Sequence, residues 1–180
     1  MITVSENISL QPITKFDYKE LYTLMKEVYP LSYQEFWNDD CSWYVNSQYS
    51  QENILKELNQ QNAEYYFVIY NKQKVGNFRF IWDENLEGFP SIKTVKLHRI
   101  YLHQNTQGKG IGKTLLRWLE NLAKQQNYEL LWLDAMNKKE QAYQFYCKQG
   151  FQYHSHCYLE FELLKDPYRK MSQLYKKITP

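Results

Sequence analysis

Three of the six glycines in this 180-residue chain, Gly108, Gly110 and Gly112, fall within five residues of one another, beside Lys109 and Lys113. Small residues in front of a helix leave the free backbone N–H groups of its first turn accessible. Those groups, the helix dipole and the two lysines would together attract an anion such as a pyrophosphate. A plain glycine turn before a helix is the alternative interpretation, and the cluster alone does not separate the two.

The spacing within residues 107–114 distinguishes three phosphate-binding patterns. A P-loop needs a leading glycine at position 107, where Gln107 stands. A dinucleotide fingerprint needs a third glycine at position 113, which is a lysine. The third pattern, Gln/Arg-x-x-Gly-x-Gly/Ala, is met by Gln107, Gly110 and Gly112. The spacing therefore favours the third pattern, and a degenerate P-loop for a nucleotide remains an alternative.

Hydrophobic periodicity predicts the elements that position this loop. Period-2 or continuous apolar runs predict strands at 7–11, 65–70, 75–82, 92–102, 130–133 and 153–164. Helical spacing predicts helices at 14–30, 50–58, 111–122 and 139–149. The order β-α-α-β-β-β-α-β-α-β indicates an α/β (α+β) fold, with a mixed central sheet flanked by helices in a single domain over residues 1–180.

Local signals mark the ends of several elements. Thr14-x-x-Asp17 is typical of a capping box at a helix start, and Pro30 is expected to close that helix. Gly150 is expected to end the helix at 139–149. Residues 31–50 are expected to be irregular and aromatic. The basic, aromatic tail 168–180 is expected to form a helix on the domain or on a partner subunit.

Composition excludes several functional classes. The net charge of +2 does not point to nucleic acid or an anionic membrane, and no apolar run approaches the ~20 residues of a membrane span. The first ten residues do not have the pattern of a signal peptide. Three unclustered cysteines fit a reducing cytoplasm. His154 and His156 lie near Cys157, but no second ligand pair accompanies them, so we expect no metal site.

Two blocks of the sequence resemble the GCN5-related N-acetyltransferase (GNAT) family. Residues 97–116 resemble the fourth strand and pyrophosphate loop of that family, and residues 144–151 resemble its helix ending Phe-Tyr-x-Lys-x-Gly-Phe. The blocks lie ~35 residues apart, with a helix and a strand predicted between them, as in the family. Within the family, the layout is most similar to bacterial spermine/spermidine N-acetyltransferases.

The resemblance implies acetyl-CoA as cosubstrate, no metal, and direct transfer of the acetyl group to a primary amine. It implies that the CoA pyrophosphate lies on the backbone of the glycine loop, formed by Gln107, Gly108, Lys109, Gly110, Ile111, Gly112 and Lys113. It implies that the pantetheine and thioester lie along the strand end at Ile100, Tyr101 and Leu102. Backbone groups there would polarise the thioester carbonyl.

The resemblance also implies catalytic residues. Tyr146 matches the tyrosine that protonates the leaving thiolate, and with an ordinary pKa near 10 a tyrosine carries its proton at pH 7. His98 occupies a position where relatives often carry a glutamate that acts as the general base, so it is a candidate for that role. Ordered water and Asp134 are the alternatives. A covalent role for Cys147 would need a base partner that the sequence does not show.

One position departs from the family pattern. Many members carry a CoA-contacting asparagine seven residues before the tyrosine, and here that position is Lys139. Either Asn137 reaches the cofactor from two residues earlier or Lys139 contacts it through its charge. Both remain candidate cofactor-binding residues.

The amine acceptor is the least defined part of the prediction. Its pocket is expected to form from residues 31–49 and 83–90, whose acidic residues, set among aromatic ones, would suit a polyamine: Glu35, Asp39, Asp40, Asp83, Glu84 and Glu87. Another small-molecule amine, or a protein or peptide amine, is the alternative acceptor. A non-catalytic acyl-CoA-binding regulatory module on the same fold is the alternative function. The chain could act as a monomer or a homodimer.

Overall fold

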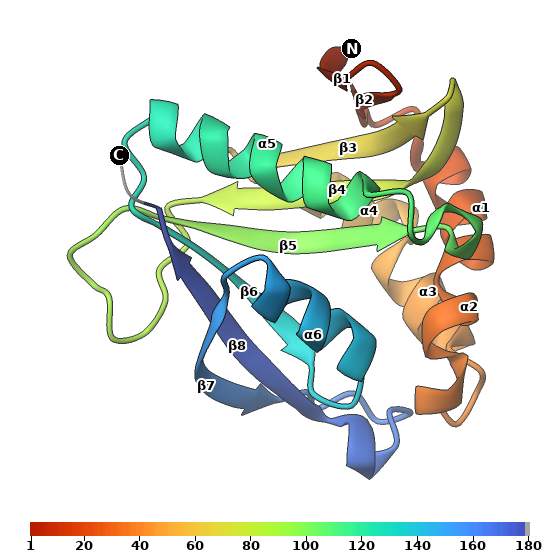
Figure 1. Ribbon diagram of the computed structural model, residues 1–180. Coiled ribbons are helices and arrows are strands. Elements are labelled where there is room, and N and C mark those ends of the chain that lie inside the picture. The colour runs from red at the N-terminus through yellow and green to blue at the C-terminus, as the bar shows by residue number, and fades with distance from the viewer. Residues whose placement is uncertain (179–180) are drawn as a thin grey trace.

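The computed structural model describes residues 1–178, and among these residues eight strands form one sheet in the order β1-β2-β3-β4-β5-β6-β8-β7 (Figure 1). The strands are β1 Ile2–Ser5, β2 Ile8–Pro12, β3 Ala63–Tyr70, β4 Gln73–Trp82, β5 Thr94–Leu102, β6 Leu130–Met136, β7 Gln152–Tyr158 and β8 Lys170–Lys177. Neighbouring strands are antiparallel except for β5 and β6, which run parallel. The predicted fold class, a mixed central sheet flanked by helices, is confirmed.

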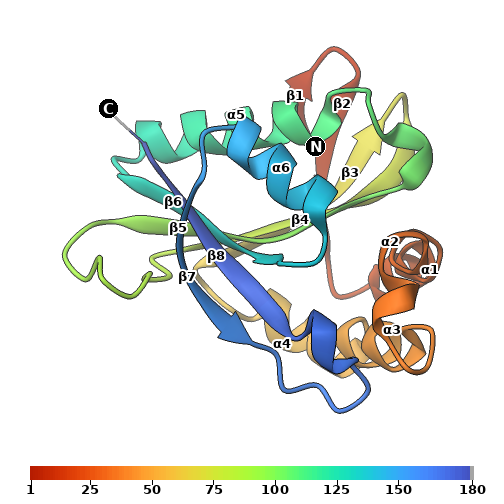
Figure 2. The ribbon, with the colours of Figure 1, turned by 60° about the horizontal axis from the view of Figure 1, so that its bottom comes forward.

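Helices cover both faces of this sheet (Figure 2). They are α1 Tyr18–Val28, α2 Pro30–Tyr33, α3 Ser42–Gln48, α4 Gln51–Leu58, α5 Ile111–Gln125 and α6 Glu140–Lys148. Helices α5 and α6 lie on one face, and α1 to α4 lie on the other (Figures 1 and 2). Within the described residues, no helix is both long and apolar enough to cross a membrane.

The alternation of side chains along β3 shows how the sheet divides the core. Tyr66 and Val68 pack into the cluster under α5, whereas Tyr65, Phe67 and Ile69 pack into the cluster under α1 to α4. Successive strand residues point to opposite faces, so a strand covered on both sides needs a continuous apolar run. This explains why residues 65–70 are apolar without interruption.

The β3–β4 hairpin is tighter than the sequence predicts. Tyr70 pairs with Gln73, so the turn consists of Asn71 and Lys72 and not of residues 71–74. Both turn residues have positive φ, 47° and 66°, as in the type I′ turns that match the twist of a hairpin. Further along β4, a Cβ at Gly76 would collide with the backbone carbonyl oxygen of Tyr101, so only glycine lets β4 and β5 approach this closely.

The N-terminal third differs most from prediction. Strand β1 was not predicted. The N-cap of helix α1 is Asp17, three residues after Thr14, the N-cap that the capping box predicts. The Asp17 carboxylate accepts hydrogen bonds from the backbone N (2.8 Å) and Oγ1 (2.6 Å) of Thr14. Pro30 starts α2 instead of closing α1, because the first position of a helix needs no N–H donor.

Three further segments differ from the sequence prediction. Residues 31–50 are largely helical, with α2, a 3₁₀ turn at Gln34–Phe36 and α3. Residues 170–177 of the tail expected to be a helix instead form strand β8, which inserts between β6 and β7, and the last two residues of that tail lie outside the described residues. Strand β7 ends at Tyr158, so the strand predicted at 153–164 is shorter than expected. The predicted helix α4 is confirmed, and the Ser50 side chain caps it by accepting from the backbone N of Asn53 (3.1 Å).

Candidate functional site

The two parallel strands at the centre of the sheet separate part-way along their length (Figure 1). Strand β5 pairs with β6 from Thr94 to Leu97, and beyond Leu97 no β5–β6 pair is formed in the described residues. The separation coincides with a β-bulge: Arg79 of β4 pairs with Arg99, Phe80 pairs with Leu97, and His98 is the extra residue between them. The backbone of β5 from Ile100 onward therefore faces an opening on its β6 side.

A first cavity lies at this opening, next to the glycine loop. This glycine-loop cavity has a volume of about 440 Å³. Among the residues that line it are Ile100, Tyr101, Leu102, Gln107, Gly108, Gly110, Ile111, Gly112, Lys113, Lys139 and Tyr146. The structure thus brings together most of the residues that are predicted from the sequence to bind the cofactor. Lys109 and Asn137 are not among the lining residues.

The start of helix α5 is built for an anion. Its N-cap is Gly110, whose φ of +76° places it in the left-handed region, and no side chain caps the first turn. Gly108 has the same φ, and a Cβ at either glycine would meet no atom within 4 Å, so the loop surface is open. Uncapped N–H groups at a helix start form an anion site. Lys113 adds positive charge there, whereas the Nζ of Lys109 lies 5.5 Å from the ring centre of Tyr70.

Asn137 and Lys139, the two candidate cofactor contacts, lie in different surroundings. The side-chain oxygen of Asn137 accepts from Ser172 Oγ (2.9 Å), and its backbone N donates to the Lys170 carbonyl (3.0 Å), so Asn137 is bound to β8. The Nζ of Lys139 donates to the Ser32 carbonyl (2.7 Å) and lies 5.3 Å from the ring centre of Tyr33, in the cavity wall. The geometry favours Lys139.

A second cavity lies on the other side of the opening. This aromatic cavity, of about 240 Å³, is lined by Tyr29, Tyr33, Trp37, Tyr44, Tyr101, Tyr146 and Phe161, together with polar and apolar groups of β5 and β6. Five residues line both cavities: Tyr33, Ile100, Tyr101, Ala142 and Tyr146. The two cavities therefore meet at these five residues, among them Tyr146 and Ile100.

Tyr146 is held at this junction by the end of helix α6. Gly150, with φ +90°, ends the helix as predicted, and the backbone N of Phe151 donates to the Tyr146 carbonyl (3.1 Å). The Tyr146 ring contacts Phe145 and Phe151 edge-on, at centroid distances of 5.2 and 5.7 Å. Burial, and to a lesser extent Tyr33, raises the pKa of Tyr146 above its ordinary value. The hydroxyl therefore stays protonated at neutral pH and is available as a proton donor.

His98 has surroundings that do not suit a general base. Its Nδ1 accepts a hydrogen bond from Arg79 Nη1 (2.5 Å). Burial, followed by the charges of Arg99, Arg79 and Lys96, lowers the pKa of His98 from 6.5 to about 2. A proton on this ring would be both poorly solvated and repelled by three cations. The expectation that His98 acts as the base is therefore not supported by its environment.

This pKa predicts a loss of stability in mild acid. Below pH 6.5 the unfolded chain binds a proton at His98 and the folded chain does not, so protonation favours unfolding. At pH 5 the cost is about 2 kcal/mol, from ~1.5 pH units at ~1.36 kcal/mol each. We expect urea denaturation to show this loss between pH 7 and pH 5, and His98→Gln to remove most of it. His156→Gln, at an exposed position on β7, is the control and should keep the wild-type slope. An unchanged slope in His98→Gln would contradict the prediction.

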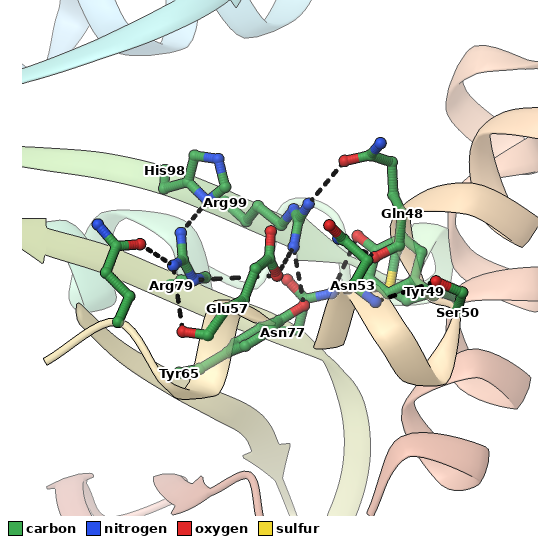
Figure 3. A network of polar contacts seen from close by, with 12 residues as sticks. Gln48, Tyr49, Ser50, Asn53, Glu57, Tyr65, Asn77, Arg79, His98 and Arg99 are labelled. Atoms are coloured by element: carbon green, nitrogen blue, oxygen red, sulfur yellow. Dashed lines mark hydrogen bonds and ion pairs between the residues drawn. The ribbon is translucent and has the colours of Figure 1, made fainter. Parts of the chain in front are cut away.

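Behind the bulge lies a network of buried charges that the sequence analysis missed (Figure 3). Arg79 and Arg99 are 1% and 4% exposed, and both face the single carboxylate of Glu57. Arg99 also donates to Gln48 Oε1 (3.1 Å), and Arg79 donates to Gln60 Oε1 (2.6 Å). A signal was present in the sequence, because the charged Arg79 lies between two phenylalanines in a predicted strand.

The acidic residues expected around the acceptor lie elsewhere. Among the described residues, none of the six carboxylates predicted for the acceptor pocket lines either cavity: Glu35, Asp39, Asp40, Asp83, Glu84 and Glu87. Asp134 is the acidic residue in the wall of the aromatic cavity, and it forms an ion pair with Lys96 (2.9 Å). Cys157 lines that cavity and Cys147 does not. Within the described residues no three His, Cys, Asp or Glu side chains converge as a metal site would require.

Comparison with known proteins identifies the family. The sequence profile of the Acetyltransferase (GNAT) family matches residues 18–151. This chain belongs to the GNAT acetyltransferase family. The GNAT chain is 27% identical, over 153 residues, to a spermidine N(1)-acetyltransferase of Thermoplasma acidophilum, covering 81% of this chain and 88% of that protein.

Solved structures share the fold of this GNAT chain. A PaiA N-acetyltransferase from Thermoplasma acidophilum, in complex with coenzyme A, superimposes with a TM-score of 0.72 at 19% identity, covering 94% of this chain and 98% of the other. An acetyltransferase from Salmonella typhimurium that modifies the N-terminal serine of ribosomal protein L7/L12 gives a TM-score of 0.69 at 16% identity, covering 99% of each chain. Because the similar proteins include a spermidine N(1)-acetyltransferase and an enzyme that modifies a ribosomal protein, the family membership leaves the acceptor open.

Proposed function

We propose that this GNAT enzyme transfers the acetyl group of acetyl-CoA directly to a primary amine of a small molecule. The observation that carries the proposal is the meeting of the two cavities at Tyr146 and Ile100. One cavity has the open helix start that suits a pyrophosphate, and the other is lined mainly by aromatic residues. A donor in the first and an acceptor in the second would bring their reactive ends together at this junction.

The residues of the glycine-loop cavity fit CoA in their donor chemistry. The N–H groups of Ile111, Gly112 and Lys113 lie in the uncapped first turn of α5 and suit the pyrophosphate. Lys113 and Lys139 supply charge in the wall, and Ile100 to Leu102 offer the backbone of the separated β5 to the pantetheine amides. Bound acetyl-CoA supplies the thioester that is the source of the acetyl group.

Tyr146 is proposed to hold the proton that the leaving sulfur needs. During transfer the carbon–sulfur bond breaks and a carbon–nitrogen bond forms, and the tyrosine hydroxyl donates its proton to the thiolate. The raised pKa of Tyr146 keeps the hydroxyl protonated before the transfer begins. Backbone groups of β5 at the separation are proposed to polarise the thioester carbonyl.

Release of the CoA thiol, measured with a thiol reagent, tests this function. The protein is incubated with acetyl-CoA and a panel containing a polyamine, an aminoglycoside, an amino amide and a peptide amine. We expect thiol release with at least one small amine, and calorimetry to show CoA binding. Release with the peptide alone would favour a protein N-acetyltransferase. CoA binding without release from any amine would favour a non-catalytic acyl-CoA-binding module, and binding of ATP in place of CoA would favour the degenerate P-loop.

A further inference from the structure

We infer that the aromatic cavity takes a small primary amine that carries no second positive charge and that enters as the uncharged free base. This inference rests on the proposed function and narrows its acceptor. An α-amino amide with an aromatic side chain has the required chemistry, and a polyamine does not. The cavity volume of about 240 Å³ is below the ~300–1,000 Å³ of sites for drug-sized ligands, so a compact acceptor fits it.

The charges around the cavity oppose a cationic guest. Lys96 and Arg99 line it, and Arg79 lies behind the bulge against His98. Two carboxylates partly neutralise these three positive charges. Asp134 is paired with Lys96, and Glu57 is paired with Arg99 and lies 4.0 Å from Arg79. The groups contributed by β4, β5, β6 and α4 therefore leave an excess of one positive charge near the guest. In a partly desolvated site such an excess disfavours a polycation.

The aromatic rings do not compensate for this charge. A ring attracts a cation through its face. The face of Tyr29 is stacked against Tyr33 and Tyr44, at centroid distances of 4.7 and 4.3 Å. Tyr33 is also approached by the Lys139 ammonium. At Tyr29 and Tyr33, ring faces occupied by other rings or by a protein cation leave the guest mainly edges and hydroxyl groups, which suit a neutral molecule.

No group in the described lining is suited to take a proton from an ammonium. The pKa of His98 is lowered to about 2, and burial raises the pKa values of Tyr33, Tyr101 and Cys157. The Asp134 carboxylate is engaged by Lys96 and by Gln173 Nε2 (3.2 Å). An amine that arrives as the free base does not need an additional base in the site.

The proton balance of the transfer then closes within the site. The neutral amine attacks the thioester carbon, the carbon–sulfur bond breaks, and the sulfur receives the Tyr146 proton. The nitrogen, now part of the new amide, releases one proton that restores the Tyr146 hydroxyl. One proton thus passes from nitrogen to sulfur, with none released to solvent. An ammonium substrate would instead carry one additional proton, which it would have to release before its nitrogen could attack.

Steady-state thiol release with three amines tests the inference. We expect kcat/KM at pH 7 and saturating acetyl-CoA to be at least tenfold higher for L-phenylalaninamide than for spermidine. The third amine, 2-phenylethylamine, retains the ring but lacks the amide that lowers the amine pKa. If the free base is the substrate, kcat/KM should rise with pH until the pH reaches the pKa of the amine. That pKa is near 8 for an α-amino group and near 10 for an alkylamine, so the rise should end at a different pH for the two aromatic amines.

Two outcomes would overturn the inference while leaving the proposed function intact. One is a preference for spermidine, and the other is a rise that ends at the same pH for both aromatic amines, which would identify an ionising enzyme group. Absence of thiol release with every amine, despite CoA binding, would overturn the proposed function and the inference with it.

A charge variant tests the electrostatic cause. Lys96→Gln removes a cation and leaves Asp134 unpaired in the wall, so the ratio of kcat/KM for spermidine to that for L-phenylalaninamide should rise at least threefold. Lys124→Gln, at an exposed position near the far end of α5, is the matched control and should leave the ratio unchanged. An unchanged ratio in Lys96→Gln would overturn the role assigned to the cavity charges.

Discussion

Replacement of Tyr146 by phenylalanine is expected to lower kcat by about 10²- to 10³-fold while the affinity for CoA changes less than twofold. Positioned proton transfer contributes ~10²–10⁴-fold to an enzymatic rate, and this substitution removes the donor while keeping the ring. The Phe145 and Phe151 contacts are made by the ring alone, so they survive the change. Stopped-flow measurement of thiol release and calorimetry with CoA check the two halves of the prediction.

Tyr143→Phe provides the matched control for this result. Tyr143 lies one turn earlier on α6, is partly buried against the same core cluster, and does not line either cavity. We expect its kcat to stay within twofold of wild type. If Tyr146→Phe turned over at the wild-type rate, the proton for the sulfur would have to come from another donor.

Glu57→Gln is expected to destabilise the fold by about 3 kcal/mol. Removing one partner of a buried ion pair typically costs ~3–5 kcal/mol, because it leaves a buried charge without compensation. Here two guanidinium groups, on Arg79 and Arg99, share this one carboxylate, whose side chain is 12% exposed. Glutamine keeps the size and one hydrogen-bond acceptor and removes only the charge. Urea denaturation at pH 7 measures the loss.

Glu52→Gln is the control for the charge change. Glu52 lies in the first turn of the same helix, α4, and is exposed. Its replacement should cost no more than about 0.5 kcal/mol, mainly through the helix dipole. A loss below about 1 kcal/mol in Glu57→Gln would mean that Gln48, Gln60 and the neighbouring carbonyl groups already compensate the two arginines.

The second half of the fold could be predicted because its signals are local. Helix α5 carries a one-sided apolar stripe, β6 begins with the continuous apolar run at 130–133, and Gly150 marks the end of α6. The spacing of Gly110 and Gly112 predicted an open helix start at α5, and the structure shows that no side chain caps it. These features depend on residues a few positions apart, which a single sequence displays directly.

The segments that escaped prediction depend on distant contacts. Helix α3 begins after Cys41, which has a positive φ of 68° and no capping side chain, and its Tyr44 is held by stacking on Tyr29. Strand β8 buries only Ser172 and Leu174, which lie two residues apart on the same face. The basic residues of the strand make this alternation hard to recognise in the sequence. The pKa of His98 depends on a bulge opposite Arg79, which local spacing does not reveal.

The insertion of β8 between β6 and β7 also determines the order in which the chain can complete its sheet. Strand β7 leaves the ribosome before β8, but its pairing partner within the sheet is β8 alone. Until β8 emerges, β7 is an unpaired strand with exposed Tyr153 and Tyr158, and nascent chains are vulnerable to aggregation at such edges. The β6 side of the opening, which carries Asp134 and leads to Tyr146, therefore acquires its supporting strand only late in synthesis.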